Sequence, residues 1–200
     1  FTLYDQSLNP MAFRIAKTVL DSDHRISLSI PKTHDTAIVT LSLKNMAVGS
    51  LIRNMGHSFF NLVGCLADRC FTYVPSHVKP FFSFQSLSRI GITKVSGSDK
   101  VKLHQGYLNM HLFLYQLIRI IPPHLAILDG FASMEGDGPV SGDRVDWRIA
   151  IAGNDGIAVD AVAAHLMGFD PDSIGYLRFC GKAGLGKTNI RDINIIGASF

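Results

Sequence analysis

The stretch RIAIAGNDGIAVDAVAAHLMG, residues 148–168, determines the predicted fold. Its first part, Arg148 to Ala152, is a short apolar run typical of a buried strand. Asp155 follows a glycine-containing turn and can cap a helix that runs to about Met167, where Gly168 can adopt the left-handed conformation that ends helices. The order strand, glycine-rich turn, helix is typical of a βα unit in a parallel sheet.

Other segments of the sequence predict further strands and helices. The apolar run 125–128 reads as a buried strand, and residues 107–121 have strong helical periodicity that ends at two prolines. Residues 26–30 alternate as a strand does, whereas residues 38–48 fit either a strand or a helix. We also expect a last strand near 190–196. The sequence therefore predicts an α/β fold with a mostly parallel sheet and helices on both faces.

Composition limits the classes of protein that the chain can belong to. Its 200 residues are 47% hydrophobic, which is enough for one packed domain over residues 1–200. A net charge of +3 without a dense Lys/Arg run gives no support for nucleic-acid or polybasic membrane binding. No apolar stretch is long enough for a transmembrane helix, and residues 1–5 lack the order of a signal peptide. We therefore expect a cytoplasmic protein.

Cysteine usage agrees with a reducing compartment. The chain has only three cysteines, Cys65, Cys70 and Cys180, too few for a disulfide framework or a closed zinc site. The spacing of Cys65 and Cys70 does not match an iron–sulfur segment, so we expect no cluster in this chain. Residues 50–103 contain several prolines and glycines, and beyond a helix in their first part, about 51–70, we expect an irregular insertion or lid there.

Polar groups interrupt the apolar sequence where the predicted strands end. Such groups are costly to bury without partners, and ligands bind at the carboxyl ends of strands in open α/β sheets. We therefore interpret these groups as one site. Its basic side would hold an anion or transfer protons, and its acidic side would act as acid and base. The candidate catalytic residues are Lys32, His34, Lys44, His104, Asp129, Glu135 and Asp160.

The carboxylates carry separate expectations. Asp129 and Glu135 flank a tight glycine-rich turn, and the pair could bind a divalent metal such as Mg²⁺ or act as acid and base. The alternative is that Asp129 accepts loop amides and Glu135 is solvated. Asp160 lies one turn inside an apolar helix, so we expect it to be buried and paired with Lys32 or Lys44, in a structural or a catalytic role.

Residues 181–188, GKAGLGKT, match the phosphate-loop pattern G-x-x-x-x-G-K-[ST]. A true phosphate loop opens a helix, whereas residues 189–196 have strand character. We therefore favour an ordinary glycine-rich loop over a nucleotide-binding site and keep a phosphate-loop-like nucleotide binder as a second alternative.

The wording of these segments resembles the prokaryotic family described as domain of unknown function 362. The matching phrases include IPKTH at 30–34, HQG at 104–106, the DG-x-x-x-MEG-x-GP segment at 129–139 and MGFDP at 167–171. Beside the family pattern we expect the chain to lack an N-terminal strand–helix portion, so that either the sequence is a piece of a longer domain or another segment completes the sheet. Relatives often carry a ferredoxin-like cluster segment, so the resemblance implies an iron–sulfur-associated family.

These observations lead to one main functional hypothesis and to alternatives. The main hypothesis is a protein, expected to be an enzyme, that binds a small anionic metabolite or cofactor in a cleft of lysines, histidines and carboxylates, with or without a divalent metal. The first alternative is a non-catalytic, redox-associated module that binds a ferredoxin-like partner. A short likeness of residues 32–45 to nickel-pincer lactate racemase would make Lys44 the anchor of an organic cofactor.

Overall fold

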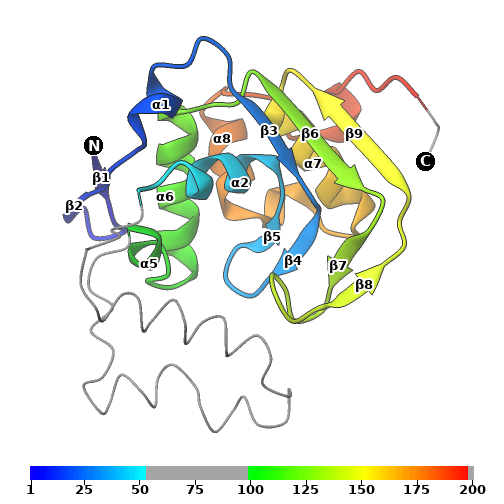
Figure 1. The fold of residues 1–200 in the computed structure, drawn as a ribbon, viewed down its shortest axis with the longest axis horizontal. Coiled ribbons are helices and arrows are strands. Elements are labelled where there is room, and N and C mark those ends of the chain that lie inside the picture. The colour runs from blue at the N-terminus through cyan, green and yellow to red at the C-terminus, as the bar shows by residue number, and fades with distance from the viewer. Residues whose placement is uncertain (53–98, 198–200) are drawn as a thin grey trace, which may run out of the picture. The chain divides into compact units, whose positions relative to one another are not determined.

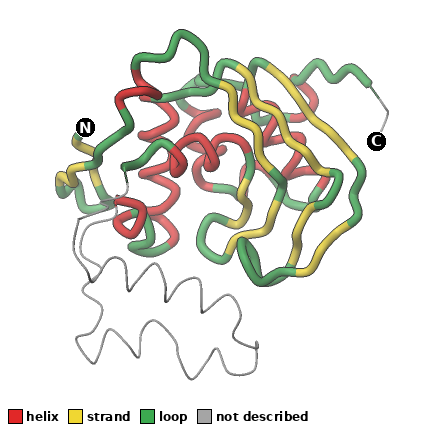
Figure 2. The backbone as a smooth tube through the Cα atoms, in the orientation of Figure 1, coloured by secondary structure: helices red, strands yellow, loops and turns green. Residues whose placement is uncertain are grey.

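The computed structural model describes residues 1–52 and 99–197 of the chain (Figures 1 and 2). The chain divides into two compact units, one formed by Phe1–Ile52 with Lys100–Phe200 and the other by Arg53–Asp99. The helix and the insertion or lid expected within 50–103 fall almost wholly outside the described residues, as do Cys65 and Cys70. The fold described below is that of the first unit.

The described part of the chain mixes short strands with helices, and none of these helices is long and apolar enough to cross a membrane. In chain order the elements are β1 (Thr2–Tyr4), β2 (Pro10–Ala12), α1 (Lys17–Leu20), β3 (Ile26–Ser29), β4 (Lys32–His34), β5 (Ile38–Thr40), α2 (Ser42–Gly49), α5 (Asp99–Lys102), α6 (Tyr107–Ile120), β6 (Leu125–Gly130), β7 (Ser133–Glu135), β8 (Asp143–Val145), β9 (Ile149–Gly153), α7 (Gly156–Leu166), η2 (Pro171–Ser173), α8 (Gly175–Lys182) and η3 (Ile190–Asp192).

Several predicted elements are confirmed. The strand–turn–helix stretch forms β9 and α7, where Asp155 accepts hydrogen bonds from the first helical amides and Gly168 has a φ of +85°. The ambiguous segment 38–48 contains both predicted structures, because β5 is followed directly by α2. The last strand expected near 190–196 is wrong. The Asn189 side chain caps a short 3₁₀ turn there instead, so the backbone does not extend.

The central sheet has the order β3-β6-β9. Strands β3 and β6 run parallel, with Ile26 opposite Leu125, whereas β6 and β9 run antiparallel, with Gly130 opposite Ile149. The prediction of a mostly parallel sheet is therefore wrong. Between β6 and β9 the chain forms the antiparallel pair β7–β8 rather than a crossover helix, and without a crossover the returning strand must run antiparallel.

A second sheet, of order β5-β4-β7-β8, continues beyond the ends of β3 and β6. Strand β4 follows β3 along the chain and pairs in parallel with β7, Lys32 lying opposite Met134. Thr33 strengthens this pairing by donating its hydroxyl to the Gly136 carbonyl at 2.9 Å. The second sheet thus extends β4 past the carboxyl end of β3, which is where polar side chains gather in open α/β sheets.

Helices α2 and α7 cover one face of the central sheet (Figure 1). On this face the Ser27 hydroxyl donates to the Ser42 carbonyl at 2.7 Å, and Leu128 is fully buried. Side chains alternate along a strand, so the other face carries Ile26 and Leu28, which are 59% and 63% exposed. The prediction of helices on both faces is wrong for the part of the chain that the structure describes.

The exposure difference between the two sheet faces can be tested with one substitution on each. We expect Leu128→Ala to lower the free energy of unfolding by about 3 kcal/mol, because it opens a cavity in the core. Leu28→Ala, the matched change on the exposed face, should cost under about 0.5 kcal/mol. Urea unfolding of both variants measures this. A large loss for Leu28→Ala would mean that this face is covered in solution.

Candidate functional site

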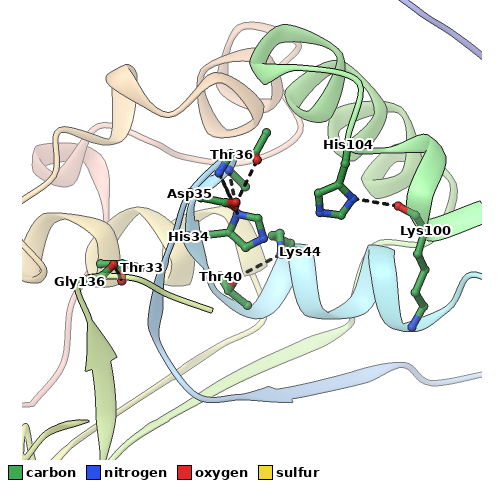
Figure 3. A network of polar contacts seen from close by, with 10 residues as sticks. Thr33, His34, Asp35, Thr36, Thr40, Lys44, Lys100, His104 and Gly136 are labelled. Atoms are coloured by element: carbon green, nitrogen blue, oxygen red, sulfur yellow. Dashed lines mark hydrogen bonds and ion pairs between the residues drawn. The ribbon is translucent and has the colours of Figure 1, made fainter. Parts of the chain in front are cut away.

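The site begins with three side chains that the second sheet places on one face. Lys32 and His34 are two residues apart on β4, so strand geometry directs them to the same side. Thr40 lies opposite Lys32 on β5 and shares that side. The loop after α5 adds His104 (Figure 3). Segments far apart in the sequence thus contribute to one group of basic side chains, called here the lysine–histidine cluster: Lys32, His34, Lys44 and His104.

Lys44 reaches this cluster from α2. The residue is only 7% exposed, and its amine donates to the Thr40 hydroxyl at 3.1 Å (Figure 3). Within residues 1–52 and 99–197 no carboxylate lies within ion-pair distance of the amine. Burial lowers the pKa of Lys44 to about 8, Asp35 opposes this shift, and Lys32 adds to it by repulsion. Lys44 is therefore a buried amine that loses its proton more easily than an ordinary lysine.

His34 is a neutral member of the cluster. Its Nδ1 accepts hydrogen bonds from the backbone amides of Thr36 and Ala37, both at 3.1 Å. Burial lowers the pKa of His34 to about 4, and the charge of Lys44 adds to the effect. Nδ1 also lies 2.8 Å from Asp35 Oδ1, a contact that favours a proton on Nδ1. We assign the proton to Nε2, because two fixed amide donors already point at Nδ1.

His104 forms the exposed side of the cluster. Its ring stacks on that of His34 with a centroid distance of 6.1 Å, and its Nδ1 lies 3.0 Å from the Lys100 carbonyl oxygen. A carbonyl can only accept, so Nδ1 carries the proton. Nε2 of His104 is then an acceptor in the neutral ring and a donor in the charged ring. His104 can therefore offer a second proton-transfer group near Lys44.

The sequence did not single out His111 as a candidate. The residue is fully buried on α6, its Nδ1 accepts from the Tyr176 amide at 3.1 Å, and its Nε2 has no hydrogen-bond partner within the described part of the chain. Burial lowers its pKa to about 4, and proximity to His34 adds to this. The sequence signal for the burial of His111 was its position between Tyr107 and Leu114 on the apolar face of the predicted helix.

Asp160 is fully buried, as expected, but its partner is not a lysine. Its carboxylate accepts from the backbone amides of Ser42 and Leu43 at 2.9 and 3.0 Å, from the Ser42 hydroxyl, and from the Tyr176 hydroxyl at 3.3 Å. The expected ion pair with Lys32 or Lys44 is therefore wrong. The first amides of α2 have no intrahelical partners, and they satisfy the carboxylate in place of a cation.

Asp129 and Glu135 lie apart from the lysine–histidine cluster. Asp129 is exposed on β6, alternates with buried Leu128 and so faces away from α2, and its Oδ1 accepts from the Phe131 amide at 3.1 Å. Glu135 is exposed on β7 opposite Asp143. The described residues contain no group of three or more potential metal ligands. A divalent ion needs more oxygen ligands than this pair supplies, so the pair by itself does not fit a metal centre.

The segment after β9 is at the other end of the sheet. Because β9 runs antiparallel to β6, Asp155 lies near Pro123 and not near Asp129. Asp155 caps α7 through the amides of Ile157 and Ala158, and it also accepts from the Lys187 amide at 3.0 Å. The polar segments therefore do not all form one site.

The phosphate-loop match lacks the required structural context. Residues 181–188 begin with the last two residues of α8 and precede only a 3₁₀ turn, so no strand leads into the loop and no α-helix leaves it. The Lys187 amine donates to the Asp192 carbonyl at 2.8 Å. The Lys187 side chain therefore connects the loop to η3.

Comparison with known proteins now identifies the family. The model of the family described as domain of unknown function 362 matches residues 5–165, and the chain belongs to this family. A curated relative, a thylakoid-associated protein from Synechocystis sp., is 25% identical over 175 residues, which cover 88% of this chain and 42% of that protein. The chain thus spans less than half of that relative. No solved structure gives a significant match.

We expect Asp160→Asn to lower the free energy of unfolding by about 1–3 kcal/mol, because its new NH₂ group must face a backbone N–H of Ser42 or Leu43 and leaves it unsatisfied. Asp129→Asn is the matched control on the exposed face and should change stability little. Denaturant unfolding of both variants measures the difference. Equal stability of Asp160→Asn and the parent would contradict the contacts described for α2.

The same variant should have a pH signature. Burial raises the pKa of Asp160 from the usual range of an aspartate to about 7, so the folded state retains a proton that the unfolded chain releases. The contribution of this group to stability is fully present below about pH 4 and is lost as pH rises through 7. The stability difference between the parent and Asp160→Asn should therefore shrink between pH 5 and 8. The buried histidines titrate in both proteins and cancel in this difference.

Proposed function

We propose that this protein binds a small anionic metabolite or cofactor at the lysine–histidine cluster. The observation that carries the proposal is the buried amine of Lys44, which has a hydroxyl for a partner and no carboxylate among the described residues. An unpaired buried charge is costly, and a bound oxyanion would offset that cost. A carboxylate or phosphate fits because both accept several N–H donors at once.

The charges around the cluster support an anion rather than a cation. Lys32 lies on the face of β4 that carries His34, and its charge repels that of Lys44. A negative ligand near both amines would reduce this repulsion. His34 and His104 add polar ring nitrogens, and a neutral imidazole ring adds no positive charge.

The proposal includes a cytoplasmic location, in agreement with the cysteine usage of the chain. The curated relative is described as thylakoid-associated, and an association of this protein with thylakoids is the alternative location. Fractionation of the native host into soluble and membrane fractions distinguishes the two locations.

Anion binding can be tested by thermal unfolding in the presence of oxalate or phosphate, with sodium chloride at equal ionic strength as the reference. At about ten times the dissociation constant an anion bound only by the folded state adds about 1.4 kcal/mol of stability. We expect the unfolding temperature to rise in the parent and in Lys17→Gln, whose lysine is exposed, but not in Lys44→Gln. An equal rise in Lys44→Gln would place the anion elsewhere and contradict the proposal.

The affinity for the anion should fall as pH rises through about 8. Below this value Lys44 is protonated and attracts the anion, and above it the amine is neutral. Asp35, whose pKa is lowered, keeps its charge over this range, and His34 is already neutral. Calorimetric titration with oxalate at pH 7 and pH 9 measures the change. An affinity that holds to pH 9 would mean that Lys44 behaves as an ordinary lysine.

A further inference from the structure

The surroundings of Lys44 allow more than electrostatic binding. A lysine that only attracts an anion works best when it is fully charged, as an exposed lysine or one paired with a carboxylate is. Lys44 has neither arrangement, because it is 7% exposed and its amine contacts only the Thr40 hydroxyl among the described residues. Desolvation beside a second cationic group is the arrangement that turns lysine into a nucleophile.

We propose that Lys44 forms an imine with a carbonyl compound that carries a carboxylate, such as a 2-oxo acid. This rests on the proposed function, because the same cluster must hold the carboxylate. Lys32 shares the strand face to which the Lys44 amine reaches, so it can hold the anionic group while Lys44 meets the carbonyl carbon. The Thr40 hydroxyl accepts one N–H of the amine and leaves the nitrogen lone pair free to react.

The proposed step balances without an external oxidant or reductant. The lone pair of the neutral Lys44 amine forms a bond to the carbonyl carbon, and the carbonyl π electrons move to oxygen. A proton passes from nitrogen to that oxygen to give a carbinolamine, which then loses water. The departing hydroxyl takes up one proton from solvent and leaves as water, and the protonated imine keeps the remaining N–H proton of the amine. The charge of Lys44 acts on the His34 ring, and the His104 ring stacks on that of His34 (Figure 3), so the two rings can relay protons between these atoms and solvent.

The test traps the imine. The chain is incubated at pH 7 with glyoxylate and cyanoborohydride, which reduces a protonated imine to a stable secondary amine, and the modification of each lysine is followed by peptide mass spectrometry. With a pKa of about 8 for Lys44, its neutral fraction exceeds that of an ordinary lysine by about two orders of magnitude. We expect Lys44 to react at least about tenfold faster than Lys17, even after its lower exposure is taken into account.

Two variants and one competitor make the result specific. Lys44→Arg keeps the positive charge and should remove the fast reaction, whereas Lys17→Arg should leave it unchanged. Oxalate, which has carboxylates but no ketone or aldehyde, should protect Lys44. Propanal has the aldehyde but no carboxylate. With propanal, the rate of Lys44 modification relative to Lys17 should not exceed the ratio of their neutral amine fractions.

The outcomes separate this proposal from the one on which it rests. Fast, oxalate-sensitive modification of Lys44 supports the imine. Modification of Lys44 no faster than that of Lys17, with oxalate still raising the unfolding temperature, overturns the imine and leaves the anion site standing. If oxalate neither protects Lys44 nor raises the unfolding temperature, both proposals are overturned.

Discussion

The contact between Asp160 and the start of α2 is the interaction on which the site depends. Leu41 occupies the capping position of α2 and has no side chain that can accept a hydrogen bond, so the free amides at this helix end need a partner from elsewhere. Asp160 supplies it from the buried face of α7 and also binds the Tyr176 hydroxyl near the start of α8. One carboxylate therefore connects three helices in the core.

This contact determines where Lys44 lies. Lys44 follows Leu43 directly, so the amides that Asp160 holds are next to the residue whose amine reaches Thr40. The hydroxyl of Ser27 on β3 donates to the Ser42 carbonyl and so also connects the start of α2 to the central sheet. A residue in the core thus positions a basic side chain at the cluster without touching it. This is a positioning role, and it acts through backbone amides rather than through the ion pair with Lys32 or Lys44 that the sequence predicts.

Local patterns allowed prediction of elements but not of strand direction. The apolar runs before Asp129 and Asn154 predicted β6 and β9, since a buried strand is marked by its own residues. Direction depends on what the intervening chain does, and the segment between these strands turns back as the β7–β8 pair instead of forming a helix. The same limit applies to the site. Positions at the ends of predicted elements placed Lys32, His34, Lys44 and His104 in one site. Only the structure shows that Asp129 faces away from them and that Asp155, which follows β9, lies at the opposite end of the central sheet.

The most direct test of the anion site is the titration of the Lys44 amine itself by NMR of ¹⁵N-labelled lysine side chains, with Lys44→Arg identifying the resonance. The Lys44 amine should have a pKa of about 8 in the free protein, and this pKa should rise when oxalate is added, because a bound anion favours the charged amine. A Lys44 amine that titrates like the exposed lysines and does not respond to oxalate would contradict the anion site.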